Sequence, residues 1–372
     1  MSYLWIAGAV VIVAAGVLLA VWTRAGRTLL VPTLAASIGA FLLVTGWLFA
    51  VDAGAPKHEA IKTGGLAGGA LIALYALWLN DRRRRTDEAR QRIDEQRQAI
   101  EVEKQRLESD RAEHDRSRVA DERFARSVEL LGHDTEQVRT GGMHALAGLA
   151  RSRAEYTQTV LDVLCAYLRR PFERTADRSS ERELEVRLTA QRLIADLLPP
   201  VGVPDAPRYA LNLTRAYLEY FDLSRRQVGE LTARAARLAE SNSLHDAVVH
   251  GDVWLTGATS TGRLHLHDME VRGRAWFSGF VGTGADFART AFLGPNKFAD
   301  STFTDRVSFA GARFAEPADF TGARFESDVD LRLAEGASAR THALTVSLDH
   351  DVLLPEGWTV EARGASTGLV HS

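Results

Sequence analysis

Three long runs of uncharged residues mark the first 80 residues of the chain. Residues 3–22 form the first run, residues 28–51 the second, and residues 63–80 a shorter third run. A helix of about 20 apolar residues rises about 30 Å, which matches the hydrocarbon core of a bilayer. The second run contains Pro32, which a membrane helix tolerates near its end. We therefore predict three transmembrane helices in residues 1–80, and the shortness of the third leaves open whether it spans fully.

A secretory signal peptide is the alternative interpretation of the first run. Such a signal has a basic start, a shorter apolar core and a cleavage site. The chain instead begins Met-Ser-Tyr-Leu-Trp, and its apolar run is longer than a signal core. The pattern therefore favours a membrane span.

Basic residues beside short loops predict the orientation of these spans, because loops rich in Lys and Arg stay in the cytoplasm. Arg24 and Arg27 lie between the first two runs, and four arginines at 82–85 follow the third. Three spans place both basic sites on one side, whereas two spans would separate them. We expect a multi-pass protein of the cell membrane whose C-terminal region is cytoplasmic. No acidic, basic or histidine side chain lies within a run, so we expect an anchor rather than a channel.

Four glycines in the third run create two overlapping G-x-x-x-G spacings. They are Gly64, Gly65, Gly68 and Gly69. Glycines at this spacing let two helices approach closely, but small residues are common in all membrane helices. The sequence leaves open whether these glycines join copies of the chain into a homo-oligomer.

Residues 81–121 form a charged segment without proline or glycine. Residues 81–118 carry 11 acids and 12 bases, and several opposite charges stand four positions apart, which supports a helix. We expect one long helical stalk. Ile93, Ile100 and Leu107 recur every seven residues as in a coiled coil, but the intervening core positions are polar. A solvated single helix and a weak coiled-coil dimer both remain open.

Apolar residues at helical spacing continue through residues 122–204. We expect a small α-helical region of short antiparallel helices, similar to armadillo or HEAT units. Two such units do not normally stand alone, so we expect them to cap the segment that follows. The only cysteine, Cys165, lies on the apolar side of its helix and is expected in the core rather than as a nucleophile. One cysteine also excludes an intrachain disulfide.

From Leu213 onward, large apolar residues recur every five or six positions, and from Phe287 to Leu331 the steps alternate strictly between five and six. Such a spacing is expected if the chain turns a corner every five or six residues. Each straight side between two corners then points one large residue inward, and four sides complete one coil. Stacked coils share parallel hydrogen bonds at a spacing of about 4.8 Å. An all-β sandwich would instead show period two. The predicted core residues of this β-solenoid, residues 205–332, are Leu213, Leu218, Leu223, Leu255, Leu266, Phe277, Phe287, Phe292, Phe298, Phe303, Phe309, Phe314, Phe320, Phe325 and Leu331.

Three positions in this register lack a large apolar side chain, namely Ala233, Ser260 and Gly282. A buried hydroxyl without a partner is costly, so we expect the Ser260 hydroxyl to bond to the backbone. A small residue also stands two positions before many of the inward residues, for example at Ala312 and Ala323.

The units Ala285-Asp286-Phe287, Ala318-Asp319-Phe320 and Ala323-Arg324-Phe325 resemble the A-(D/N)-(L/F) unit of pentapeptide-repeat proteins. The resemblance implies a right-handed β-helix, although the six-residue steps depart from the strict repeat. Together with the apolar runs, the charged segment and the sequences at 123–146 and 166–171, the chain is similar over residues 1–335 to membrane-anchored pentapeptide-repeat proteins of high-GC Gram-positive bacteria. That resemblance implies an architecture and no particular activity.

Residues 333–372 break the five-and-six spacing. Leu344, Val346 and Leu348 alternate with polar residues as in a half-buried strand, and Trp358 follows Pro355-Glu356-Gly357. An open solenoid end exposes unpaired strand edges, so we expect a cap over 333–362 followed by a tail. A disordered tail is the competing interpretation.

Motifs for catalysis are missing from the sequence: it has no Walker motif, G-x-G-x-x-G, H-E-x-x-H or G-x-S-x-G. His245, His250, His265 and His267 cluster in the solenoid, but no tight ligand spacing recurs, so we expect solvent-facing polar residues rather than a metal site. We expect no catalytic residue, no cofactor and no metal, and hence no enzyme.

Three functions are compatible with this pattern. The first is a membrane-tethered scaffold that presents the solenoid to a cytoplasmic protein partner. The second is a DNA mimic that regulates a type II topoisomerase, as some soluble pentapeptide-repeat proteins do. Residues 205–372 carry 22 acids and 17 bases, which is modest for a mimic. The third, an enzyme or transporter, has no supporting residues. We expect no nucleic-acid binding, and the sequence does not identify the partner.

Overall fold

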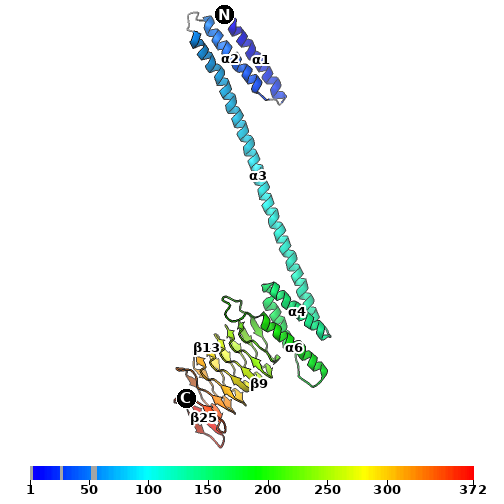
Figure 1. Ribbon diagram of the computed structural model, residues 1–372, viewed down its shortest axis with the longest axis vertical. Coiled ribbons are helices and arrows are strands. Elements are labelled where there is room, and N and C mark those ends of the chain that lie inside the picture. Colours follow the sequence, from blue (N-terminus) through cyan, green and yellow to red (C-terminus); the bar gives the residue numbers. More distant parts are fainter. Residues whose placement is uncertain (1–2, 26–27, 52–56) are drawn as a thin grey trace. The chain divides into compact units, whose positions relative to one another are not determined.

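The computed structural model describes residues 3–25, 28–51 and 57–372, with side chains except at 85–90 and 92–93 (Figure 1). The chain divides into two compact units, Met1–Glu113 and His114–Ser372, which are described separately below. The predicted order of apolar helices, charged helix, small helical region and β-solenoid is present.

Three helices of the first unit are long and apolar enough to cross a membrane. They are α1 (Leu4–Arg24), α2 (Leu30–Val51) and the start of α3, within Lys57–Arg84. Helix α3 begins before the third uncharged run and continues without a break through the charged segment to Leu131. Most of the described side chains of this segment are exposed, including Ile100 and Leu107. Opposite charges pair along it, as in Lys104–Glu108, whose charged atoms lie 3.9 Å apart.

Glycines allow α2 to pack closely against both of its neighbours. A Cβ on Gly46 would collide with the backbone of Trp5 in α1, and a Cβ on Gly64 of α3 would collide with Thr45 Oγ1 in α2. The hydroxyl of Ser37 donates to the carbonyl of Gly68 at 2.8 Å. The G-x-x-x-G spacing of Gly64 and Gly68 therefore serves packing within the chain. In the other spacing, a Cβ added at Gly65 or Gly69 would have nothing within 4 Å.

The helical region of the second unit consists of the end of α3, α4 (Glu136–Ser152), a short 3-10 turn (Ala154–Tyr156), α5 (Thr157–Leu168) and α6 (Arg178–Leu197). Their buried faces hold Met143, Leu146, Leu161 and Ile194. Cys165 lies in this core, and burial raises the pKa of its thiol to about 12, so the thiol stays protonated.

A buried arginine joins α5 to α6. Arg187 is 1% exposed, and it donates to the carbonyls of Leu168 at 3.0 Å and Arg170 at 2.7 Å. Its charge is balanced by Glu183 at 3.2 Å, which also accepts from Tyr167. Arg187 thus satisfies backbone carbonyls at the end of α5 that the helix itself cannot pair.

The helical region closes the first edge of the solenoid through side-chain amides. Gln158 of α5 donates to the carbonyl of Ala210 and accepts from its N–H, both at 2.9 Å, as a neighbouring strand would. Gln191 of α6 accepts from the N–H of Glu219 at 3.2 Å. Because an open strand edge invites aggregation, these bonds explain why the helices cap the solenoid.

The predicted β-solenoid is present, with about seven turns of parallel strands on four faces. We name two faces by their outward residues. The tryptophan face contains β1 (Ala210–Asn212), β4 (Glu230–Thr232), β8 (Val253–Trp254), β11 (Ala275–Trp276), β14 (Asn296–Lys297), β18 (Ala318–Asp319) and β21 (Ala339–Arg340). The threonine face contains β2 (Tyr217–Glu219), β5 (Arg237–Ala239), the start of β9 (Thr259–His265), the start of β12 (Val281–Asp286), β15 (Thr302–Phe303), β19 (Arg324–Phe325) and β22 (Thr345–Ser347).

The other two faces complete each coil. The histidine face contains β6 (Asn242–Ser243), the ends of β9 and β12, β16 (Val307–Ser308), β20 (Val329–Asp330) and β23 (Val352–Leu353). The valine face contains β3 (Gln227–Val228), β7 (Val248–Val249), β10 (Glu270–Val271), β13 (Ala291–Phe292) and β17 (Arg313–Phe314).

Aromatic rings stack through the interior from coil to coil. The ring centroids of Phe287 and Phe309 are 4.6 Å apart, and those of Phe277 and Phe298 are 4.9 Å apart. Fourteen of the fifteen residues that the sequence places in this core are at most 3% exposed. Phe314 is half-buried, because β17 is the last strand of its sheet and no following strand covers it.

The small positions in the register have separate explanations. The Ser260 hydroxyl donates to the carbonyl of Gly262 at 2.8 Å, as expected. At Gly282, the ring of Phe280 occupies the space where a side chain would lie, and it packs 5.5 Å from Phe303. The large inward residue here is therefore Phe280, two positions before the position that the spacing predicts.

A column of glycines forms the corner between the valine and tryptophan faces. Gly229, Gly251, Gly273 and Gly294 lie one coil apart, and a Cβ on each of the last three would lie 2.4–2.7 Å from the backbone of the glycine before it. The N–H of Gly251 donates to the carbonyl of Gly229 at 2.6 Å. Only glycine permits this close approach, and the sequence carries its signal as the 22-residue recurrence of Gly229, Gly251 and Gly273.

The C-terminal end differs from the expected arrangement. The solenoid does not stop at Leu331, because β21, β22 and β23 pair in parallel with β18, β19 and β20. The covering strand is β25 (Thr367–His371), which pairs antiparallel with β22 and with β24 (Thr359–Ala362). Trp358 is partly buried against the core. The strand that closes the threonine face therefore lies beyond residue 362, in the segment expected to be a tail.

We predict that Phe309→Ala lowers the free energy of unfolding by about 3–5 kcal/mol, because deletion of a buried aromatic ring leaves a cavity. Arg313→Ala removes an exposed side chain and is expected to change stability by less than about 0.5 kcal/mol. Thermal or urea unfolding of the two variants, followed by circular dichroism, measures the difference. Equal destabilisation would show that the inward and outward assignments are wrong.

Candidate functional site

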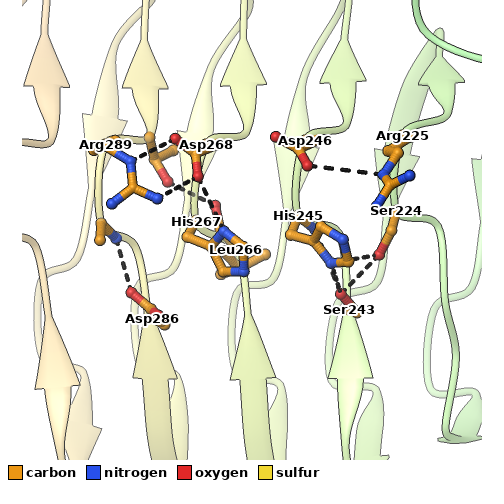
Figure 2. Close-up of polar contacts among 12 residues, drawn as sticks. Ser224, Arg225, Ser243, His245, Asp246, Leu266, His267, Asp268, Asp286 and Arg289 are labelled. Atoms are coloured by element: carbon orange, nitrogen blue, oxygen red, sulfur yellow. Dashed lines mark hydrogen bonds and ion pairs between the residues drawn. The ribbon is translucent and has the colours of Figure 1, made fainter.

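The histidine face gathers polar side chains from successive coils, as Figure 2 shows. The Nδ1 atom of His245 lies 2.8 Å from the hydroxyl of Ser224 and 2.7 Å from that of Ser243. The two hydroxyls are themselves 2.8 Å apart. One serine comes from the preceding coil and the other stands two residues before the histidine, so the stacking of coils creates this triangle.

A second histidine continues the column. The rings of His245 and His267 stack with centroids 5.0 Å apart. His267 Nδ1 lies 3.1 Å from Oδ2 of Asp268. Arg289 donates one bond to each oxygen of this carboxylate, from Nε to Oδ1 at 2.7 Å and from a terminal nitrogen to Oδ2 at 2.5 Å (Figure 2). The Arg289 guanidinium, together with His267, lowers the pKa of Asp268 to about 2. This carboxylate is therefore ionised and fully engaged in binding Arg289 and His267.

The four histidines of the sequence do not meet at one point. His265 joins His245 and His267 on the histidine face, and burial lowers its pKa. His250 lies beside the valine face, where Nε2 bonds Gln227 at 2.9 Å and Nδ1 bonds Arg272 at 3.1 Å. Burial, followed by the nearby Arg272 and Arg208, lowers the pKa of His250.

The polar groups on the histidine face pair mainly with hydroxyls and arginines. Among the residues that the structure describes, no group of three His, Cys, Asp or Glu side chains could hold a metal ion. The carboxylate of Asp246 faces Arg225 at 3.9 Å rather than His245 (Figure 2). A Ser-His pair without an orienting acid lacks the third member of a catalytic triad.

The tryptophan face carries a different surface, which the sequence analysis did not identify. Trp254 and Trp276 project from adjacent strands with ring centroids 5.9 Å apart, and both are partly exposed. The guanidinium of Arg234 lies 4.2 Å from the centre of a Trp254 ring, and that of Arg274 lies 5.2 Å from it. Cation–π contacts at these distances hold the indole in one orientation.

Unpaired cations flank the two tryptophans. Arg274 is paired with Asp252 at 3.0 Å, but Arg234 and Lys297 are exposed and make no ion pair with another described residue. A partly exposed tryptophan pair therefore lies on a parallel sheet, with Arg234 over Trp254 and Lys297 opposite Trp276 on the next strand. The sequence signal was present, since Trp254 and Trp276 stand 22 residues apart, one coil in this solenoid.

Comparisons with known proteins agree with the fold of the C-terminal half. Residues 287–335 match a family described as "Pentapeptide repeats (9 copies)". The search of curated proteins and that of solved structures found no match. The matched residues lie in the coils with stacked phenylalanines, and the same parallel pairing continues on both sides of them. The match and the β-solenoid together support a pentapeptide-repeat protein, a class that is generally not enzymatic.

Proposed function

We propose that this protein is a membrane-tethered scaffold whose solenoid binds a cytoplasmic protein partner through the tryptophan face. The observation that carries the proposal is the pair Trp254 and Trp276, with Arg234 and Arg274 over Trp254 and Lys297 opposite Trp276 on the next strand. Tryptophan and arginine are the residues most enriched among those that dominate binding energy at protein interfaces. The partner expected on this face brings acidic groups to Arg234 and Lys297.

The membrane tether rests on three helices that are long and apolar enough to span a bilayer. Close packing through Gly46 and Gly64 supports a bundle of these helices rather than separate segments. We infer that Arg24 and the arginines at 82–85 lie on the cytoplasmic side, which leaves the N-terminus outside and the solenoid inside the cell.

Reporter fusions test this topology. A reporter fused after Ser372 is expected to be active only in the cytoplasm, because three spans follow an external N-terminus. The matched control is a fusion after Val51, which is expected to report an external location. Extracellular activity of the Ser372 fusion would contradict the proposed topology.

The DNA-mimic alternative has weaker support. A mimic requires a continuous negative surface, whereas bases alternate with acids on this solenoid, as in the pairs Asp252–Arg274 and Asp268–Arg289. A membrane tether also separates the solenoid from a topoisomerase acting on the chromosome. We therefore place the protein-scaffold function first.

Purification from solubilised membranes tests the scaffold function. The tagged full-length chain is expected to retain a protein partner, and Trp276→Ala combined with Lys297→Glu is expected to reduce its recovery at least about tenfold. Arg313→Glu, on the valine face, is the matched control and should leave recovery unchanged. A supercoiling assay with gyrase runs in parallel. Inhibition of gyrase without a membrane partner would favour the DNA mimic and overturn the scaffold.

A further inference from the structure

The helical region has an open groove between the end of α3 and α4. Two adjoining hollows of about 640 Å³ and 400 Å³ lie along these helices and share Val119, Arg123, Leu149 and Ser152. The groove extends along α3 from Asp115 to Leu130, a rise of about 22 Å or four helical turns. All of its residues belong to the second compact unit.

Glycines explain why the groove opens where it does. A Cβ on Gly142 would lie 2.9 Å from the carbonyl oxygen of Ser127, so the two helices touch closely at that level. Near Gly148, two turns further along α4, nothing lies within 4 Å of the Cβ position. The small residues Ala145 and Gly148 thus form an open floor, with Val119 exposed to 41% at the side.

The rim of the groove is basic. Four arginines line it, against two acids, Asp115 and Glu122. The arginines are Arg116, Arg123, Arg126 and Arg153. Glu122 is paired with Arg118 at 3.7 Å, Arg126 with Glu129 at 3.1 Å and Arg153 with Glu155 at 3.0 Å. Arg123 makes no ion pair with another described residue, so it is the cation that the groove offers to a ligand.

We propose that this groove binds an amphipathic helix of a partner protein, with an apolar stripe against Val119 and Gly148 and acidic residues toward Arg123. Helix-in-groove binding uses apolar residues at i, i+3/i+4 and i+7, and the groove is long enough for four turns. A second copy of this chain is disfavoured, because its own basic rim would face the first. This site lies outside the solenoid and does not depend on the tryptophan face.

A displayed library of random 18-residue peptides, selected on the full-length chain in nanodiscs, tests the proposal. We expect the enriched peptides to combine helically spaced apolar residues with Asp or Glu. The strongest peptide is expected to bind Arg123→Glu and Gly148→Leu at least about tenfold more weakly than the unaltered chain. Arg123→Lys should keep most of the affinity, since it preserves the charge.

Two control variants separate this site from the proposed scaffold surface. Trp276→Ala and Arg313→Glu should bind the peptide as the unaltered chain does, and circular dichroism checks that each variant folds. If Gly148→Leu does not fold, Arg123→Glu and Arg123→Lys still decide the question.

Four outcomes would overturn the groove proposal. The first is enrichment of neutral or basic peptides, and the second is a peptide that still binds both Arg123→Glu and Gly148→Leu. The third is a peptide whose binding is lost only in Trp276→Ala, and the fourth is a selection that enriches no peptide more on the unaltered chain than on the Arg123→Glu protein. Mass photometry adds a fifth: a dimer that Gly148→Leu dissociates would identify a second copy as the occupant. Only the loss of binding in Trp276→Ala alone bears on the tryptophan face, because it would place the peptide there. The other outcomes leave the proposed scaffold surface untested and unchanged.

Discussion

The stacking of one large apolar side chain per side of each coil is the interaction on which the rest of this structure depends. Phe287, Phe309 and their equivalents bury complete rings from coil to coil, while backbone hydrogen bonds link each coil to the next. Neither interaction is available to a single coil, so stability accumulates only as coils are added. The ends must then be closed, by Gln158 and Gln191 at the first coil and by β25 at the last.

Because inward side chains provide the packing, the outward positions of the solenoid are free to bind other molecules. The inward residues pack in the core, and the corner glycines let the backbones of successive coils approach closely. Outward residues lie beside their equivalents one coil away, about 4.8 Å along the axis. Equivalent residues therefore become columns. Trp254 and Trp276 form one such column beside cations, and His245 and His267 form another beside serine hydroxyls and the Asp268 carboxylate.

The sequence predicted the solenoid because its inward residues are large, aromatic and regularly spaced. It missed three features that the spacing of the inward residues does not define. Phe280 fills the space at Gly282 from two positions away, Gly273 packs against the backbone of Gly251, and β25 reaches back to β22. The tryptophan face was also missed, because two tryptophans 22 residues apart become neighbours only once the coil length is known. The groove between α3 and α4 depends on helix packing, which periodicity alone does not define.

Distances between spin labels on one column of the threonine face test the central claim most directly. Arg237 pairs with Thr259, and successive pairings lead through Val281 and Thr302 to Arg324 and then Thr345. Labels at 237 and 324, four coils apart, are expected at about 19 Å, and labels at 237 and 345 at about 24 Å. Cys165 is buried and should not interfere. The stacked solenoid would be contradicted if the second distance did not exceed the first by about one strand spacing, or if either distance were greater than about 35 Å.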